Sequence, residues 1–293
     1  MRKAKLSAWV GTMAAVGATL AIASTLIPVA VSAQDYRNST EHYEALKRQA
    51  GGGAKMTWDK LPDWTGVWTR GPKGVGLRFD PAQPTLQQTT AQLTPEFAQK
   101  HKEKLERVAK GIEWDPISNC IPPGYPRWLT EPFLRDFALR PDQTLLINEM
   151  VNDIRRIYTD GRGHTPPEEA YPLWNGDSIG FWDGDTLVIH TTQLMGGQYQ
   201  RSQPDYTDQV ETVERWRKVD DNTIEAAVTV YDPPALVKPW SVTQRYIRVT
   251  TPGIRIRSWV CEENANNDVF QNKAGTTEHV LPGPGAGPKK VEK

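Results

Sequence analysis

Asp160 and His164 stand four residues apart in a polar turn, Asp160-Gly-Arg-Gly-His164, close to Arg155. A carboxylate that orients an imidazole forms an acid/base pair, because histidine titrates near neutral pH. The same residues are also explained by an Asp-Gly turn that carries a surface histidine. The turn therefore indicates proton-transfer chemistry or an ordinary loop.

His190 offers a second imidazole, placed within the apolar run Leu187 to Thr192. In a strand, alternate side chains share a face, so Val188 and Thr192 lie on the side of His190. An inward His190 would line a pocket, and an outward one would be inert. The candidate catalytic residues are Arg155, Asp160, His164, Asp177 and His190.

A β-hairpin is expected to position these groups. The runs Ser178 to Trp182 and Thr186 to Thr192 flank Asp183-Gly184. Asp-Gly between β-prone runs predicts a type I′ turn with both residues at its centre. This hairpin would bring together Asp177, Asp183, Asp185 and His190.

No metal or organic cofactor is expected. Asp177, Asp183 and Asp185 lack the regular spacing and terminal Glu of a calcium loop. The five histidines are scattered, so three or four zinc ligands do not cluster in the sequence. Nucleophile-elbow and phosphate-loop patterns are absent as well.

The expected elements are two short helices and a long series of strands. The helices are predicted at about 40–49 and 94–110, each followed by glycine. Short strands at this spacing predict a mainly β fold, an antiparallel meander that closes into a lipocalin-like barrel with short flanking helices. The predicted strands are Phe133 to Arg140, Thr144 to Asn152, Ile154 to Thr159, Ser178 to Trp182, Thr186 to Thr192, Val210 to Val219, Thr223 to Tyr231, Ser241 to Thr250 and Ile254 to Glu262.

The amino-terminal residues predict export. Arg2, Lys3 and Lys5 precede an apolar run over residues 6–31, and Val31-Ser-Ala33 suits signal cleavage. The alternative is an uncleaved membrane anchor. We therefore expect a signal peptide at 1–33, a helix and linker at 34–61, the barrel at 62–281, a disordered tail at 282–293 and a periplasmic location.

Charge and cysteine content add two expectations. The signal holds three of the 35 basic residues and none of the 35 acidic ones, so the mature net charge is −3. This balance gives no support for nucleic-acid binding. Cys120 and Cys261 are the two cysteines, and in an oxidising compartment they favour a disulfide over free thiols.

Aromatic residues predict a binding wall or a sealed core. The chain has 11 tryptophans, and indoles combine a large apolar area with one N–H donor. The candidate ligand-binding residues for a small apolar or aromatic molecule are Tyr125, Arg127, Trp128, Trp174, Trp182 and Trp240.

Two resemblances add to this reading. Trp64-Thr-Gly66-Val-Trp68 resembles the Gly-x-Trp opening of lipocalin-like (calycin) barrels. The resemblance implies that this tryptophan packs against an arginine from a late strand, for which Arg255 or Arg257 is the candidate.

A second resemblance extends over residues 62–265. It is carried by Cys120-Ile-Pro-Pro-Gly-Tyr-Pro-Arg127, the run from Arg155 to His164, Asn175-Gly-Asp-Ser-Ile-Gly180, Trp182-Asp-Gly-Asp-Thr-Leu-Val188 and Cys261-Glu-Glu-Asn264. Together they are similar to a group of exported proteins of environmental Gram-negative bacteria. This resemblance implies export and fold, and no mechanism.

Three functions remain open at this point. The first is a periplasmic protein that binds a small apolar or aromatic molecule in a barrel pocket. The second is a cofactor-independent lyase, isomerase or hydrolase with acid/base residues at the barrel mouth, where loops commonly gather such groups. The third is a cell-envelope module that binds another protein, with no membrane span after signal cleavage.

Overall fold

The protein is described by a computed structural model, which covers residues 36–71, 79–81, 83, 89–119, 121–259, 269–271 and 277–279. The predicted signal peptide, the tail at 282–293, Cys120 and Cys261 lie outside these residues. The disulfide and the signal peptide therefore stay predictions. In the described part of the chain, neither of the two α-helices has the length and apolar character needed to cross a bilayer.

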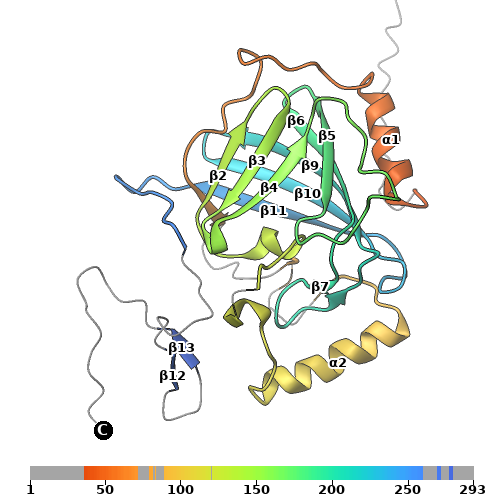
Figure 1. Ribbon diagram of the computed structural model, residues 1–293, viewed down its shortest axis with the longest axis vertical. Coiled ribbons are helices and arrows are strands. Elements are labelled where there is room, and N and C mark those ends of the chain that lie inside the picture. The colour runs from red at the N-terminus through yellow and green to blue at the C-terminus, as the bar shows by residue number, and fades with distance from the viewer. Residues whose placement is uncertain are drawn as a thin grey trace, which may run out of the picture. The chain divides into compact units, whose positions relative to one another are not determined.

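Nine strands of the described chain close into a barrel, so the predicted mainly β fold is confirmed (Figure 1). The strands follow the order β1-β11-β10-β9-β6-β5-β4-β3-β2 around the wall, and β1 closes the barrel against both β2 and β11. The barrel strands are β1 (Trp68–Gly71), β2 (Arg135–Leu139), β3 (Gln143–Asn148), β4 (Asp153–Tyr158), β5 (Asp177–Asp183), β6 (Thr186–Thr192), β9 (Glu211–Asp220), β10 (Thr223–Tyr231) and β11 (Trp240–Arg248).

Short elements accompany the barrel. They are the helices α1 (Ser39–Gln49) and α2 (Pro95–Ala109), the 3-10 turns η2 (Pro116–Asn119), η3 (Arg127–Thr130) and η4 (Met150–Asn152), and the strand pairs β7 (Gly197–Gln198) with β8 (Asp205–Tyr206) and β12 (Val269–Gln271) with β13 (Thr277–His279).

The wall is antiparallel except at one place. β4 and β5 run parallel and pair through Tyr158 and Ile179, so the predicted antiparallel meander is wrong for this pair. The long loop at 159–176 carries the chain back to the start of β5, which reverses the expected direction. This loop carries His164, and its crossing places His164 beside β5 and β6.

The predicted hairpin forms with its turn shifted by one residue. Asp183 pairs with Thr186, so Gly184 and Asp185 are the central residues. Gly184 has a φ of 59°, whereas Asp185 is not among the residues with positive φ. A positive φ at the first central residue alone is typical of type II′, so the predicted type I′ turn is wrong. Glycine supplies this conformation without steric cost.

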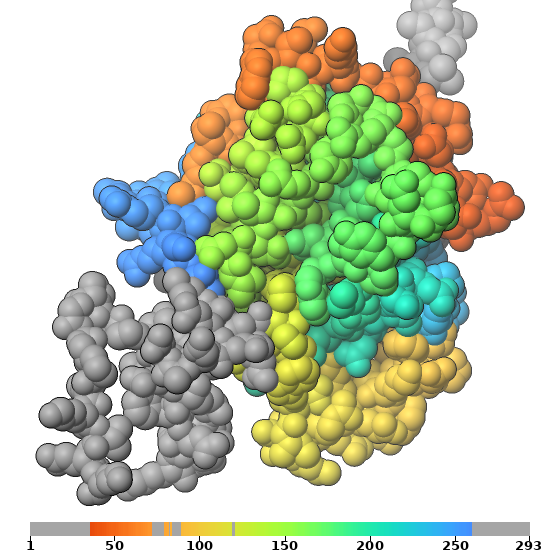
Figure 2. All heavy atoms as spheres, in the orientation of Figure 1, coloured from red at the N-terminus to blue at the C-terminus, as the bar shows by residue number. Residues whose placement is uncertain are grey.

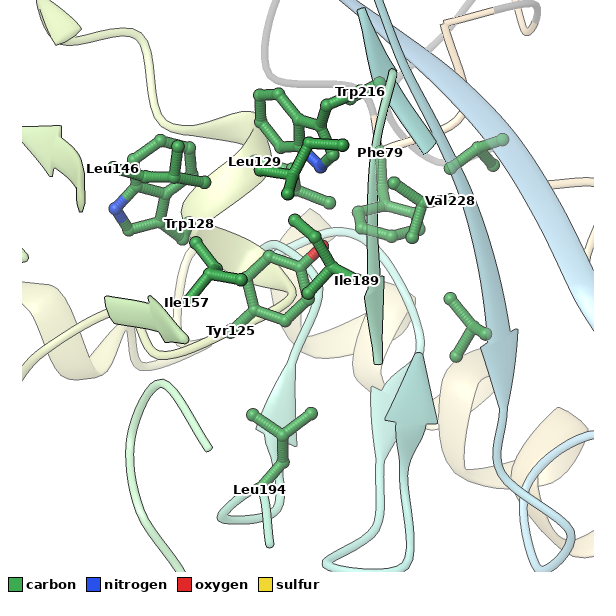
Figure 3. Packing of buried hydrophobic residues seen from close by; sticks show 14 of the residues in the cluster. Phe79, Tyr125, Trp128, Leu129, Leu146, Ile157, Ile189, Leu194, Trp216 and Val228 are labelled. Atoms are coloured by element: carbon green, nitrogen blue, oxygen red, sulfur yellow. The ribbon is translucent and has the colours of Figure 1, made fainter. Parts of the chain in front are cut away.

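Alternation along the strands separates two apolar regions. On β6, Leu187 and Ile189 join the core enclosed by the barrel, while Val188 joins a second cluster with Tyr43 and Phe181. Tyr43 belongs to α1, which packs on β6 and β9. The outer face of these strands is therefore covered by α1. Inside the barrel, rings such as Trp128, Tyr125 and Phe79 converge with aliphatic side chains (Figure 3).

Trp68, the tryptophan of the lipocalin-like Gly-x-Trp opening, contacts a different arginine from the two expected. The guanidinium of Arg248 lies 4.4 Å from the centre of the Trp68 ring, and these residues pair between β1 and β11. Arg255 and Arg257 come after the end of β11. The strand predicted from Ile254 does not form over 254–259, so neither arginine is carried by a late strand of the barrel. The expected type of contact is present, and the prediction of its partner is wrong.

Candidate functional site

Helix α1 carries one part of the candidate site to the outer wall of the barrel. Asn38 caps the helix by accepting a hydrogen bond from the Glu41 amide at 2.8 Å. The cap starts the helix so that Ser39 and His42 are buried against the strands. In the space-filling view, the orange-red surface of α1 adjoins the green surface of the chain segment that includes the loop at 159–176 (Figure 2).

A continuous chain of hydrogen bonds joins this helix to the loop. Asp177 Oδ2 lies 3.0 Å from His164 Nδ1, and His164 Nε2 lies 3.0 Å from His190 Nδ1. His190 Nε2 then lies 3.0 Å from Ser39 Oγ, which donates to Glu211 Oε2. Five side chains from the loop, β5, β6, α1 and β9 thus form one network, here called the outer-wall relay.

The two ends of the outer-wall relay reach solvent and its centre does not. The side chains of His164 and Asp177 are 21% and 12% exposed. Glu211 is 37% exposed, whereas His190 is 4% exposed and Ser39 is fully buried. A proton held at the centre can therefore exchange with water only through the end groups.

Both carboxylates of the relay favour the ionised form. Burial raises the pKa of Asp177, but hydrogen bonds from His164 and the Thr165 amide outweigh it and hold the pKa below its usual value. Burial likewise raises the pKa of Glu211, and contacts with His190 and Ser39 bring it below the usual value. The relay thus ends in two carboxylates.

Aromatic groups of α1 cover the centre of the relay. The Tyr43 ring stacks on His190 with centroids 5.3 Å apart and planes at 22°. His42 Nδ1 lies 2.9 Å from the hydroxyl of Tyr231, and Tyr36 stacks on His42. Burial, with smaller effects of nearby cations, lowers the pKa of His42 to about 4, so this imidazole is neutral at pH 7.

The structure pairs His164 with a carboxylate other than the one expected. Asp160 forms a close ion pair with Arg162, with an Nη2–Oδ2 distance of 2.6 Å. His164 is oriented by Asp177 instead, so the predicted Asp160–His164 pair is wrong. Asp160 and Arg162 are neighbours in a tight turn, which satisfies the carboxylate locally.

Asp183 and Asp185 do not join the relay. Asp183 pairs with Thr186 at the hairpin turn, at the opposite end of β5 from Asp177, and its carboxylate lies 3.4 Å from Arg215. The predicted gathering of these aspartates with His190 is therefore wrong, since the hairpin separates its two ends by the length of the strands.

Arg155 lies inside the barrel, apart from the two histidines. Its guanidinium contacts Glu214 at 2.6 and 3.0 Å and donates to Thr191 at 2.6 Å, and all three residues are fully buried. Burial lowers the pKa of Arg155, but Glu214 outweighs it and the pKa ends above its usual value. The ring of Tyr125 lies 3.6 Å from the guanidinium carbon. Arg155 therefore belongs to an internal ion pair.

The predicted aromatic wall is mostly core. Tyr125, Trp128, Trp182 and Trp240 are at most 3% exposed and belong to the apolar cluster within the barrel. Trp174 is 39% exposed and sits apart on the loop before β5.

Arg127 is also buried within the protein. It forms a bidentate pair with Asp115 at 2.9 Å and a third bond with Glu131 at 2.8 Å. These contacts satisfy its guanidinium without a ligand, since they engage all three of its nitrogen atoms.

Ser39 and Glu211 are functional candidates that the sequence reasoning missed. Ser39 is 151 residues from His190 and carries no motif around it. Glu211 opens β9, and the signal that could have found it is the alternation that places it on the face of Val213. Only the register between β6 and β9, which pairs His190 with Val213, brings that face beside the imidazole.

The polar groups of the relay are arranged for proton transfer. Within the described ranges, no three or more His, Cys, Asp or Glu side chains are grouped so that they could hold a metal ion. Ring nitrogens and oxygens in the relay face one another at hydrogen-bonding distance. Such a chain can pass a proton between its members.

Comparison with known proteins identifies no family. No family model matches the chain, and no curated protein matches it. Among solved structures, a secretory abundant heat soluble protein from Ramazzottius varieornatus is similar at 11% identity, with 64% of this chain and 95% of that chain covered and a TM-score of 0.28. Our assignment of a closed β-barrel therefore rests on the strand pairing described above.

Proposed function

We propose that the protein is a cofactor-independent enzyme that uses acid/base chemistry on the outer wall of its barrel. The observation that carries the proposal is the outer-wall relay, in which Asp177, His164 and His190 are joined by bonds of 3.0 Å. Hydrolase, lyase and isomerase reactions all need such a proton donor and acceptor. In this proposal the site is on the outer wall, between α1 and the loop at 159–176, and not at the barrel mouth, where it was expected.

His164 is the imidazole that a substrate would meet. Its side chain is 21% exposed, whereas His190 behind it is 4% exposed. Asp177 accepts from both His164 and the Thr165 amide, which fixes the orientation of the ring. His190 is placed to exchange a proton with His164 from the buried side.

Hydrolysis is the reaction to test first, with p-nitrophenyl acetate and p-nitrophenyl butyrate as probes. We expect His164→Gln and Asp177→Asn to lower kcat by about 100-fold or more, the scale of general acid/base catalysis. His101→Gln is the matched control, because His101 lies on α2, away from the relay, and contacts the Ser202 carbonyl. Equal rates for the wild type and His164→Gln, including no rate for either, would contradict a hydrolase and leave the lyase and isomerase reactions to be tested with the same variants.

Binding of a small apolar molecule is a second proposal, supported by Trp174. The residue is 39% exposed, and its backbone carbonyl accepts a hydrogen bond from the amide of the buried Tyr125 at 2.7 Å. Tryptophan fluorescence titrated with 1-anilinonaphthalene-8-sulfonate tests it. Quenching that saturates in the wild type and weakens in Trp174→Ala supports the site, and identical titrations exclude Trp174 from it.

Export to the periplasm and the disulfide are proposals of the sequence. Their support is the signal-like run at 1–33 and the pair Cys120 and Cys261. Intact mass spectrometry of the periplasmic protein is the test. We expect a chain that begins at Gln34 and takes up no iodoacetamide before reduction, whereas a chain that keeps Met1 would indicate an anchor.

A further inference from the structure

The outer-wall relay contains more hydrogen bonds than its neutral members can supply. Four bonds join the five side chains in the order Asp177, His164, His190, Ser39 and Glu211. Each bond needs one hydrogen. A serine hydroxyl and two neutral imidazoles supply one hydrogen each, and an ionised carboxylate supplies none. Three hydrogens cannot complete four bonds, so the intact chain holds one additional proton.

The surroundings place this proton on the imidazoles. The pKa values of both Asp177 and Glu211 lie below their usual values, so both carboxylates are anions at neutral pH. An imidazolium between two carboxylates is stabilised by both of them.

The other groups that face the centre do not supply a competing charge. Tyr43 of α1 stacks on His190, and its neighbour His42 contacts the Tyr231 hydroxyl of β10. Burial keeps His42 neutral and raises the pKa of both tyrosines. Arg215, which lies two residues beyond Val213 on the same face of β9, pairs with Asp183 at the hairpin turn.

We infer that His164 and His190 share one proton beyond their neutral complement, and that Ser39 conducts it to Glu211 as the solvent-exposed outlet. The proton count rests on the hydrogen bonds alone, and its catalytic consequence rests on the proposed function. Ser39 and Glu211 are relay residues in this scheme, since a substrate would meet His164.

The transfer conserves every hydrogen. His164 begins as an imidazolium that donates to Asp177 and to His190, while His190 donates to Ser39 and Ser39 to Glu211. The Ser39 hydrogen passes to Glu211, the His190 Nε2 hydrogen to Ser39, and the His164 Nε2 hydrogen to His190 Nδ1. At the end His164 is neutral, Glu211 is protonated and the other groups regain their starting hydrogen count.

Glu211→Gln changes the count in a defined way. The glutamine amide can donate to Ser39, which then donates to His190, so all four bonds form without the additional proton. We expect both imidazoles to become neutral in this variant. Glu225→Gln is the matched control, because Glu225 pairs with Arg245 on the surface of β10 and β11.

Histidine side-chain 15N NMR at neutral pH measures the protonation directly. We expect an imidazolium pattern for the His164–His190 pair in the wild type and in Glu225→Gln, and its loss in Glu211→Gln, with backbone amide spectra to confirm folding. A neutral pair in the wild type, or an imidazolium that persists in folded Glu211→Gln, would overturn the inference.

Turnover separates this inference from the proposed function. If the NMR pattern is found but His164→Gln keeps full activity, the proposed function fails and the proton site stands. If the pattern is missing while His164→Gln loses activity, the relay inference alone fails. We expect Ser39→Ala to reduce kcat by about 10-fold and to leave KM unchanged, because proton exchange with solvent slows while the substrate contact is kept.

Discussion

Removal of the buried carboxylate inside the barrel should destabilise the fold strongly. Glu214 is fully buried and contacts the Arg155 guanidinium at 2.6 and 3.0 Å. It also accepts from Trp216 Nε1 at 2.8 Å and from Thr212 at 3.0 Å. Glu214→Gln keeps the size of the side chain and removes the charge, which leaves a buried guanidinium without its counter-ion.

The expected loss of unfolding free energy is about 3–5 kcal/mol, the range for breaking one partner of a buried ion pair. Burial raises the pKa of Glu214, but Arg155 and the hydrogen bonds outweigh it and hold the pKa below its usual value, so the native carboxylate is charged. Urea denaturation at neutral pH measures the loss. The surface pair of Glu225 and Arg245, with side chains 22% and 57% exposed, provides the control Glu225→Gln, expected to cost about 1 kcal/mol or less.

Two outcomes would refute this reasoning. A Glu214→Gln protein within about 1 kcal/mol of the wild type would show that the pair does not depend on charge. The double variant Arg155→Met with Glu214→Leu removes both charges and should recover much of the loss, since replacing a whole buried pair by apolar groups is often neutral. A double variant as unstable as Glu214→Gln would point to lost packing as the cause.

Three other outcomes are expected. The pKa of His42 is lowered from 6.5 to about 4 in the folded protein. As the pH falls, His42 is therefore protonated in the unfolded chain before it is protonated in the folded one. The wild type should therefore lose up to about 3 kcal/mol between those pH values, and urea titrations of His42→Gln should show a shallower pH dependence. Gly180→Ala should lower Tm more than Gly163→Ala, because a Cβ at Gly180 would lie 2.6 Å from a backbone oxygen, while one at Gly163, which has no positive φ, meets nothing within 4 Å; equal shifts in calorimetry would contradict this. Arg248→Ala should lower the unfolding free energy, measured by urea denaturation, by about 1 kcal/mol, because the cation–π contact with Trp68 is lost. An unchanged unfolding free energy would show that this contact does not stabilise the fold.

Most of the barrel could be predicted from local pattern. The run Thr223 to Tyr231 forms β10 at the predicted bounds, and as far as Val228 buried side chains alternate with less buried ones. The segment from Ile254 reads as a strand by the same pattern, but it does not pair over the described residues 254–259. Strand formation needs a partner edge, and β1 already occupies the free edge of β11.

The candidate site was predictable in part. His164, His190 and Asp177 were singled out by residue type, and the structure brings them together. The expected role of Asp160 did not follow, because Arg162 satisfies its carboxylate two residues away. Spacing along the chain does not show whether a side chain will contact a residue close in sequence, as Asp160 contacts Arg162, or one brought near by the sheet, as His164 contacts Asp177.

The amino-acid sequence by itself determined the class of fold and the local elements. Alternating apolar residues, turn glycines and the Asn38 cap act over a few residues, so their effect can be read without knowledge of the rest of the chain. The same alternation placed Val188 and His190 on one face of β6.

Only the tertiary structure decided which face is covered and by what. α1 packs on the outer face of β6 and β9, which buries His190 where an outward residue was expected to be inert. It also places Ser39 against an imidazole 151 residues away. Such contacts depend on strand register and helix docking, which arise from burial summed over many residues, and no local motif encodes them.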